Sequence, residues 1–437
     1  MADPDFDCVV VGARCAGAPL ATHLARAGVR VLLLESKKLP CDQPMSTHVI
    51  QTRGMDYVDA LGVGARVRGL SPPLRVIRME LGGRPHDVHF VEGRSAHCLR
   101  RTVLDPILQE NAIAAGAVLR DETPVTGLVR DGARVTGVEV LRNRKRESIT
   151  ARMVIGADGR NSTVAKHVGA EEYFGYDSPR GGYWAYWPVP REWTEDAPYS
   201  LFDMYLGFEG DSARFVFHAD GDLLLIGTLS PPERLARFGS NHEDAYIKEL
   251  AASPVTGPLT AGRKPVGRVL GLKKARFAFR TPVGPGWALV GDAGLHKDPT
   301  PGNGITDALR DASALAAAIV DGSERAFARY WRRRDVESFE LYRQAEDLGS
   351  PGYDNPFNAL VWENLHDPIV AHRVALAADR RVLPYDVVPP MKALSWLGRA
   401  LLHGRFDVVP FFVEGSKRTR DVQQEHAHRK LLLDAIS

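Results

Sequence analysis

The chain has few cysteines. Only four occur among 437 residues, and no pair has the short spacing, such as C-x-x-C, that holds a zinc ion. A dense disulfide framework needs more cysteines than this. We therefore expect no metal site and reduced thiols, as in a cytoplasmic protein. The N-terminal residues show neither the basic region nor the cleavage site of a secretion signal, which favours the same location.

An excess of one charge is also missing. Lys and Arg number 56 and Asp and Glu number 54, so the formal net charge is +2. Without a strong field, the chain is not drawn to nucleic acid or to an anionic membrane surface. No apolar run reaches the ~18 residues of a membrane span, so we expect no stable membrane insertion. No feature of the sequence indicates an oligomeric state.

Apolar residues make up 44% of the chain, as in a soluble globular protein, and are sufficient for two or three packed units. The first unit opens with a β-α-β pattern. Residues 6–11 are apolar on both faces, as a strand inside a parallel sheet requires. A helical pattern over 16–27 and a second apolar strand over 29–34, which ends at Glu35, complete the pattern. This opening is typical of a doubly wound fold.

The rest of the chain alternates between two patterns. Asp131-Gly132 predicts a tight hairpin within residues 125–140, and alternating aromatic and polar residues over 181–230 predict a mostly antiparallel sheet. A buried strand at 287 and a helix over 305–320 return to the first pattern, and helices follow. The predicted fold class is α/β: a doubly wound Rossmann-like domain with an inserted, mostly antiparallel β-sheet domain and a helical C-terminal region. The expected boundaries are 1–72, 97–170 and 281–345 for the discontinuous first domain, 73–96 and 171–280 for the inserted sheet, and 346–437 for the helical region.

A glycine-containing loop, Gly12-Ala13-Arg14-Cys15-Ala16-Gly17, follows the first strand. Dinucleotide phosphates approach backbone N–H groups at the start of a helix, which such a loop permits. Gly12 allows the tight turn, Gly17 allows the helix to pack on the strand, and Glu35 is placed to bind an adenosine ribose. Arg14 stands where the middle glycine is expected, and its side chain could lie along the phosphates or over the adenine. Alone, the loop is also compatible with an ordinary strand-to-helix turn.

Two further segments follow apolar strands. The first is Gly156-Ala157-Asp158-Gly159, and the second is Gly291-Asp292-Ala293-Gly294, which leads into the 305–320 helix. A carboxylate at the end of a parallel strand can hold the ribitol hydroxyls of a flavin, while the next helix start offers N–H groups to a pyrophosphate. Asp292 is therefore the strongest single candidate.

Together, the three segments resemble those of the class A flavin-dependent monooxygenase family. This family has the p-hydroxybenzoate-hydroxylase-like fold and is related to geranylgeranyl-reductase-type enzymes and flavin halogenases. The resemblance implies that the first loop binds the ADP half of FAD, that Asp158 serves FAD and a transient nicotinamide, and that Asp292 binds ribitol and flavin. The full set of candidate cofactor-binding residues is Gly12, Arg14, Cys15, Ala16, Gly17, Glu35, Ser46, Thr47, Arg101, Asp158, Gly291, Asp292, Pro299, Gly302, Gly304 and Ile305.

Arg101 resembles the family's arginine that opens a helix and contacts the FAD linker, with Arg100 as the alternative. An arginine that only solvates the helix start is also compatible. The pattern departs from the family at Lys166, which follows the Asp-Gly motif where many members carry arginine. A second departure is Leu295-His296-Lys297-Asp298, which follows Gly294 where Ala-His is commoner. These departures indicate a sub-branch of the family.

Two histidines are candidate catalytic residues. His48 lies where the family's chain turns towards the flavin, as a donor or base, or alternatively as a cap of the next helix. His296 follows the aspartate that is expected to bind ribitol, and an imidazole near a flavin could serve as an acid or base, although a structural hydrogen bond is an alternative. The candidate substrate-binding residues alternate with positions expected to face solvent, and aromatic residues of this kind are also common in ordinary cores. They are Trp184, Tyr186 and Phe217.

The resemblance implies FAD as cofactor, NADPH or NADH as transient electron donor, and O2 and a small molecule as substrates. Reduced flavin would form a C4a-hydroperoxide that hydroxylates an aromatic or polyketide-like compound of secondary metabolism. A geranylgeranyl-type alkene reductase is one alternative. A halogenase is another, although Trp187-Pro188-Val189-Pro190 matches only half of the segment expected there. A flavoprotein that holds FAD without redox chemistry is a third.

Overall fold

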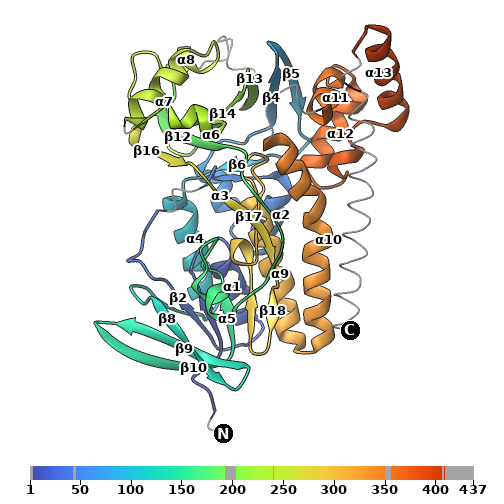
Figure 1. Ribbon diagram of the computed structural model, residues 1–437. Coiled ribbons are helices and arrows are strands. Elements are labelled where there is room, and N and C mark those ends of the chain that lie inside the picture. The colour runs from blue at the N-terminus through green and yellow to red at the C-terminus, as the bar shows by residue number, and fades with distance from the viewer. Residues whose placement is uncertain are drawn as a thin grey trace.

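The structure is a computed structural model that describes residues 3–42, 46–191, 203–239, 241–349, 356–405 and 408. Two large sheets lie one above the other, and a long helix, α10 (Glu324–Gly349), runs alongside both (Figure 1). The lower sheet is mainly parallel and the upper sheet mainly antiparallel. The predicted α/β fold class is confirmed.

The lower sheet has its central strand, β1 (Phe6–Val11), between two parallel neighbours. The strands follow the order β18 (Val283–Gly284), β19 (Trp287–Leu289), β10 (Lys145–Gly156), β1, β2 (Val31–Leu34) and β7 (Val118–Arg120). The second strand begins two residues later than predicted because Val29 N–H donates to Leu24 O at 3.1 Å and so closes the preceding helix. The three motif segments follow β1, β10 and β19. These strands are neighbours, so the motifs meet at the carboxyl ends of the strands.

Both faces of the lower sheet are covered. Three helices pack on one face through buried side chains such as Leu20, Leu104 and Leu309. They are α1 (Gly17–Arg26), α4 (Arg101–Ala114) and α9 (Gly304–Asp321). The predicted hairpin, β8 (Val125–Asp131) and β9 (Arg134–Arg142), covers the other face together with α5 (Thr163–Val168). The hairpin pairs with the first half of β10, which is longer than the strand predicted before Gly156.

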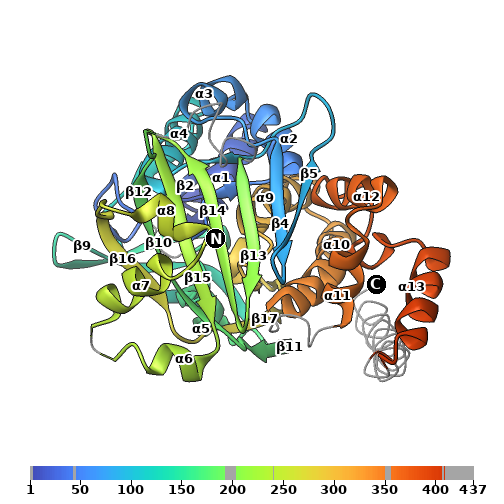
Figure 2. The ribbon, with the colours of Figure 1, turned by 90° about the horizontal axis from the view of Figure 1, so that it is seen from above.

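The upper sheet has seven strands that lie side by side (Figure 2). Their order is β16 (Val266–Leu272), β12 (Gly181–Pro188), β15 (Leu223–Ser230), β14 (Ser212–Ala219), β13 (Met204–Glu209), β4 (Val76–Leu81) and β5 (Arg84–His89). All neighbours are antiparallel except β13 and β4. Strands β4 and β5, which come from the first hundred residues, thus join a sheet that is built mainly from residues after 180. The domain boundaries themselves stay a prediction.

Side chains alternate along β12 between two buried faces. Tyr183 and Trp187 pack against α6 (Pro232–Ala236), α7 (His242–Ala251) and α8 (Thr256–Thr260). Trp184 and Tyr186 belong to the core on the opposite face. The expectation that the positions alternating with Trp184 and Tyr186 face solvent is therefore wrong, because these helices cover that side.

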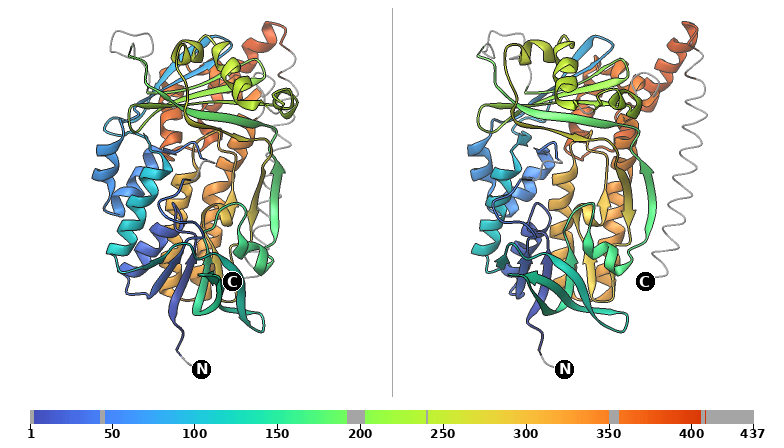
Figure 3. Two further views of the ribbon diagram at one scale, coloured as in Figure 1. Left: turned by 90° about the vertical axis from the view of Figure 1, so that its left-hand side faces the viewer. Right: turned by 60° about the vertical axis from the view of Figure 1, so that its left-hand side comes forward.

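The C-terminal region is helical, as predicted, in the part that the structure describes. After α10 come α11 (Pro356–Asn364), α12 (Pro368–Ala378) and α13 (Pro390–Leu402), which lie beside the upper sheet (Figures 2 and 3). Beyond 405, only residue 408 is described, so most of the final stretch of the predicted region lies outside the described residues. None of the helices in the described ranges is long and apolar enough to cross a membrane.

The remaining helices and short strands link the two large sheets. Strands β3 (Val49–Ile50) and β6 (His97–Cys98) pair with one another, and α2 (Thr52–Ala60) and α3 (Gly64–Leu70) follow β3. A third sheet joins β11 (Glu172–Asp177), β17 (Arg276–Arg280) and β20 (Leu295–His296). The segment after the third motif therefore reaches from the lower sheet towards the upper one.

Candidate functional site

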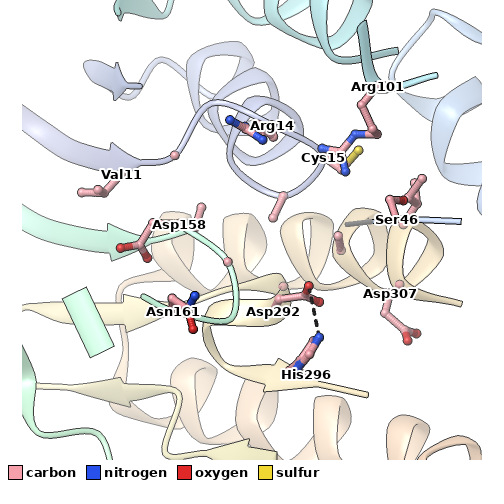
Figure 4. A pocket seen from close by; sticks show the side chains of 18 of the residues that line it. Val11, Arg14, Cys15, Ser46, Arg101, Asp158, Asn161, Asp292, His296 and Asp307 are labelled. Atoms are coloured by element: carbon pink, nitrogen blue, oxygen red, sulfur yellow. Dashed lines mark ion pairs between the residues drawn. The ribbon is translucent and has the colours of Figure 1, made fainter. Parts of the chain in front are cut away.

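A cavity of about 540 Å³ lies where the three motif segments meet (Figure 4). Its size falls within the range of small-molecule and cofactor sites, about 300 to 1,000 Å³. Every candidate cofactor-binding residue except Gly17 lines it. These are Gly12, Arg14, Cys15, Ala16, Glu35, Ser46, Thr47, Arg101, Asp158, Gly291, Asp292, Pro299, Gly302, Gly304 and Ile305.

The first loop has the close approaches that its glycines were expected to permit. Gly12 has a φ of +105°, and a Cβ atom there would lie 2.4 Å from Ala157 O. A Cβ atom on Gly17 would lie 1.8 Å from Gly12 O. Gly17 therefore allows α1 to pack closely on the loop, although it does not line the cavity. Gln109 Nε2 holds the loop from another side by donating to Ala13 O at 2.7 Å. Phosphate groups can approach the backbone at such a loop.

Arg14 is accommodated without the backbone strain that a glycine position suggests. It is not among the residues with positive φ, and its Nε lies 3.4 Å from Glu35 Oε2. The guanidinium also contacts Cys41 Sγ at 3.3 Å and Asp42 O at 3.4 Å. The side chain is thus directed to the end of β2, where it lines the region that the sequence assigns to an adenosine ribose.

Asp158 is occupied within its own segment. Its carboxylate accepts hydrogen bonds from Ser162 Oγ at 2.5 Å and from the backbone N–H groups of Thr163 at 2.6 Å and Val164 at 3.3 Å. Burial raises the pKa of the Asp158 carboxyl, and these hydrogen bonds offset part of that effect. Asp158 therefore shapes the cavity wall by holding the start of α5, and its contact with cofactor or nicotinamide stays a prediction.

Asp292 presents the most open carboxylate of the three segments. It lies on the short turn of 3-10 helix Gly291–Ala293 directly after β19, and its side chain is 46% exposed. Among the described residues, its only ion-pair partner is His296, whose Nε2 lies 4.0 Å from Oδ2 (Figure 4). Its oxygens are free to accept hydrogen bonds from a ligand's hydroxyl groups.

His296 is held with one ring nitrogen towards the cavity. Its Nδ1 lies 3.0 Å from Arg276 O, and because a carbonyl only accepts, this nitrogen carries the hydrogen. The ring packs against Phe277, with centroids 4.9 Å apart. Nε2 therefore faces Asp292, and both side chains line the cavity. Both uses considered for His296 remain compatible with this geometry, because the structural hydrogen bond occupies only one nitrogen.

The two neighbouring arginines have different positions. Arg101 lines the cavity and is buried, and its Nε and one terminal nitrogen donate to the Asp105 carboxylate at 2.8 and 2.9 Å. Arg100 instead pairs with Asp220, in the turn between β14 and β15, at 2.7 Å. Cys15 Sγ also contacts Asp105 at 3.4 Å, and burial raises the pKa of the Cys15 thiol, which keeps it uncharged. Of the two arginines, Arg101 is the one at the cavity.

The sequence motifs did not reveal a buried ionic cluster beside the cavity. Asp307, in the first turn of α9, pairs with Lys297, Arg310 and Arg380, and both Asp307 and Lys297 line the cavity. Burial alone would raise the pKa of Asp307, but the three cations lower it overall. In the sequence, these residues look like ordinary charges of a helix and a loop. Only the fold brings Arg380, from beyond the end of α12, to this point.

His48 does not line the cavity, although its chain neighbours Thr47 and Val49 do. It has a φ of +60°, its Nδ1 is hydrogen-bonded to Tyr186 Oη, and the two rings stack with centroids 5.7 Å apart. Neither His48 nor Tyr186 nor Trp184 is among the residues that line a cavity described here. The expectation that His48 caps the next helix is wrong, because Gln51 is the N-cap residue of α2. Its use as a flavin-side base stays a prediction.

A second cavity, of about 130 Å³, adjoins the first and shares Val49 and Gly302 with it. Phe217, one of the three candidate substrate-binding residues, lines it. Apolar side chains from the upper sheet and from α10, α11 and α12 form most of its wall. They are Ile77, Met79, Met204, Leu206, Phe217, Leu341, Leu348, Val361, Trp362 and Val374. No group of three or more His, Cys, Asp or Glu suited to a metal ion occurs in the described ranges.

Comparison with known proteins agrees with this geometry. Residues 5–182 match the family model described as FAD binding domain. A digeranylgeranylglycerophospholipid reductase of Methanococcoides burtonii is 25% identical over 362 residues, covering 75% of this chain and 79% of the relative. The ubiquinone hydroxylase UbiL of Rhodospirillum rubrum is 25% identical over 405 residues, covering 88% of each chain. The structure of a flavin-dependent brominase superposes with a TM-score of 0.74 at 17% identity, covering 90% of this chain and 99% of the brominase.

The fold, the cavity and the matched domain define a protein that binds FAD. The FAD-binding domain and the relatives along the chain are those of an FAD-dependent oxidoreductase, and they fit the class A flavoprotein family. The resemblance inferred from the three motifs is thereby confirmed at the level of the family. The similar proteins include a reductase, a hydroxylase and a brominase, so the reaction has to be argued from this chain's own residues.

Proposed function

We propose that the protein is an NAD(P)H- and O2-dependent monooxygenase that hydroxylates an aromatic or polyketide-like small molecule. The observation that carries the proposal is the junction of the two cavities. A polar cavity with an open Asp292 carboxylate adjoins an apolar one, and Val49 and Gly302 line both. An apolar substrate in the second cavity would lie next to a cofactor in the first. The ubiquinone hydroxylase that aligns along 88% of this chain supports this choice.

FAD, when bound, supplies the redox chemistry of the reaction. The chain's own residues bind and orient. The starts of α1 and α9 offer N–H groups and a positive dipole to anionic groups, Asp292 accepts hydrogen bonds from hydroxyls, and Arg101, whose charge is paired with Asp105, lines the wall. His296 Nε2 faces the cavity beside Asp292, while Nδ1 is bound to Arg276 O. The apolar walls of the second cavity exclude water from the reacting groups.

An alkene reductase is the second candidate. The first relative named above is a reductase, and an apolar cavity also suits a prenyl chain. The halogenase alternative has less support. Trp187, in the half-matching segment, is fully buried on the face of the upper sheet opposite the second cavity, and its Nε1 donates to Tyr246 Oη at 3.0 Å. Among the described residues that line the apolar cavity, none is a lysine.

A single series of reactions separates these candidates. Purified flavin-loaded protein is mixed anaerobically with NADPH or NADH, and bleaching of the flavin absorbance is followed. Oxygen is then admitted with phenols, polyketides, prenyl compounds or halide, and the products are analysed by mass spectrometry. Bleaching followed by oxygen-dependent hydroxylation is the expected result. Absence of bleaching with either nicotinamide excludes a self-sufficient monooxygenase, a saturated prenyl product without oxygen favours the reductase, and a brominated product favours the halogenase.

A further inference from the structure

A short segment before α2 forms part of the wall of the flavin cavity. Ser46, Thr47 and Val49 line this cavity, and Val49 also lines the apolar one. His48 stands between Thr47 and Val49 and lines neither cavity. We call residues 46–49 the wall segment. Because His48 joins its two neighbours in the chain, the contacts that fix His48 also fix the residues on either side of it.

The backbone of His48 has a left-handed conformation. Its φ of +60° lies in a region that residues other than glycine rarely adopt, because a Cβ atom crowds the backbone there. Such a conformation persists only where the surrounding structure holds it, and it is concentrated at functional sites. The shape of the wall segment therefore depends on what holds His48.

Tyr186 of the upper sheet contacts the His48 ring. Tyr186 Oη is hydrogen-bonded to His48 Nδ1, and the two buried rings are nearly parallel, at an angle of 13° and with centroids 5.7 Å apart. Burial raises the pKa of the Tyr186 phenol, so the hydroxyl keeps its proton in this contact. Tyr186 belongs to β12, which lies inside the upper sheet between β16 and β15. The contact thus ties the wall segment to a strand of that sheet.

The backbone of the wall segment is held from other directions. Leu99 N–H donates to His48 O at 3.2 Å, and His48 N–H donates to Ser46 Oγ at 3.0 Å. These bonds come from the residue after β6 and from the segment itself. The contact with Tyr186 is different because it reaches the side chain of His48 from the upper sheet.

We propose that Tyr186 is a positioning residue of the flavin site, which holds His48 in the left-handed conformation and so keeps Thr47 and Val49 in the cavity wall. Without this contact, the wall segment would adopt other conformations, and FAD would have to restore the bound one at the expense of affinity. This role of His48 needs no acid–base chemistry. It depends on FAD binding in the cavity and not on the reaction that follows.

Titration of the apoproteins with FAD, followed by flavin fluorescence, tests the role of Tyr186 without turnover. Tyr186→Phe removes the hydroxyl and keeps the ring, and we expect the dissociation constant of FAD to rise about five-fold, the effect of one hydrogen bond. Tyr183→Phe is the matched control. Tyr183 lies on the other face of β12, and among the described residues its hydroxyl has no hydrogen-bond partner. This variant should bind FAD as the wild type does.

Two substitutions of His48 separate the backbone conformation from the imidazole. His48→Ala and His48→Gly both lose the ring and its contact with Tyr186. Glycine adopts a positive φ without steric cost, whereas alanine does not. We therefore expect His48→Ala to weaken FAD binding at least about five-fold and His48→Gly to stay within about two-fold of the wild type. An imidazole that acts on FAD directly would make the two variants equally weak.

Circular dichroism and melting temperature confirm that each variant is folded. Unchanged FAD affinity of Tyr186→Phe would overturn the inference, as would equal affinities of His48→Ala and His48→Gly. The proposed function fails separately. If the FAD affinities follow the prediction but NAD(P)H and O2 yield no hydroxylated product, the positioning role stands and the monooxygenase assignment does not. If the wild type forms product while the alanine and glycine variants bind FAD equally, the inference is the part that fails.

Discussion

Arg14 Nε lies 3.4 Å from Glu35 Oε2, so the residue at the middle-glycine position is tied to the residue at the end of β2. The pair lines the cavity, where the arginine balances the glutamate's charge near the region expected for the cofactor's adenosine ribose. Arg14, which departs from the glycine pattern, thus forms part of the cavity wall.

Reversing this charge should weaken FAD binding. In Arg14→Glu, two carboxylates would face one another beside an anionic ligand, and we expect the dissociation constant of FAD to rise at least about ten-fold. Arg14→Gly restores the common glycine pattern and should change affinity less. Fluorescence titration of the apoprotein with FAD measures both. Equal affinities of Arg14→Glu and the wild type would show that the pair has no part in binding.

Gly17→Ala should destabilise the fold. Its Cβ atom would lie 1.8 Å from Gly12 O, so the loop or α1 must shift, and overpacking of this kind costs about 1 to 3 kcal/mol. Gly69→Ala is the matched control, because no heavy atom lies within 4 Å of its added Cβ and Gly69 is within a helix. Urea denaturation should show the loss for the first variant and an unchanged or higher stability for the second. Similar stabilities of the two variants would contradict the packing role.

Asp307→Asn should also destabilise the protein, for an electrostatic reason. The substitution removes the carboxylate that pairs with the buried Lys297 and the partly buried Arg380, while Arg310 keeps Asp311; breaking a buried ion pair costs about 3 to 5 kcal/mol. Asp321→Asn removes a carboxylate from an exposed pair with Arg329, which is worth at most about 1 kcal/mol. Chemical denaturation of both variants distinguishes the two costs, and an equally small loss in each would exclude the cluster as a stabilising element.

His97 should make stability depend on pH. It lies between Ser71 Oγ at 2.9 Å and Ser95 Oγ at 3.0 Å, and burial together with the charge of Arg68 lowers its pKa from 6.5 to about 4. Between these pH values the unfolded chain binds the proton and the folded chain does not. Stability is therefore lost as pH falls through this window, by at most about 3 kcal/mol.

The variant His97→Gln removes this titration. Unfolding free energies of the wild type and the variant are compared at neutral pH and at about pH 4.5. The wild type should lose more stability on acidification than the variant does. Equal losses would mean that His97 does not contribute to the acid sensitivity.

The features of the fold and of the cavity that the sequence could predict depend on local patterns. Three strand-end motifs marked the edge of the lower sheet because a parallel strand followed by a helix has a recognisable apolar pattern. All the candidate cofactor-binding residues except Gly17 do line one cavity. Gly17 is the exception because its effect is packing beneath the loop rather than contact with a ligand.

The parts that were missed depend on long-range packing. Trp362 lies on α11 and Arg380 follows the end of α12, and no local pattern shows that this part of the chain lies against the upper sheet and α9. Trp184 and Tyr186 were expected to alternate with solvent-facing positions, whereas α6, α7 and α8 bury the other side of β12.

The central claim is that the cavity at the ends of β1, β10 and β19 binds FAD with Asp292 as an acceptor. The direct measurement is the flavin content of purified wild-type protein and of Asp292→Ala, followed by titration of each apoprotein with FAD. We predict that the wild type retains FAD in near-stoichiometric amount and that Asp292→Ala, while still folded, binds it at least about ten-fold more weakly. A wild-type chain without affinity for FAD, or an Asp292→Ala variant with a full complement of flavin, would contradict the account.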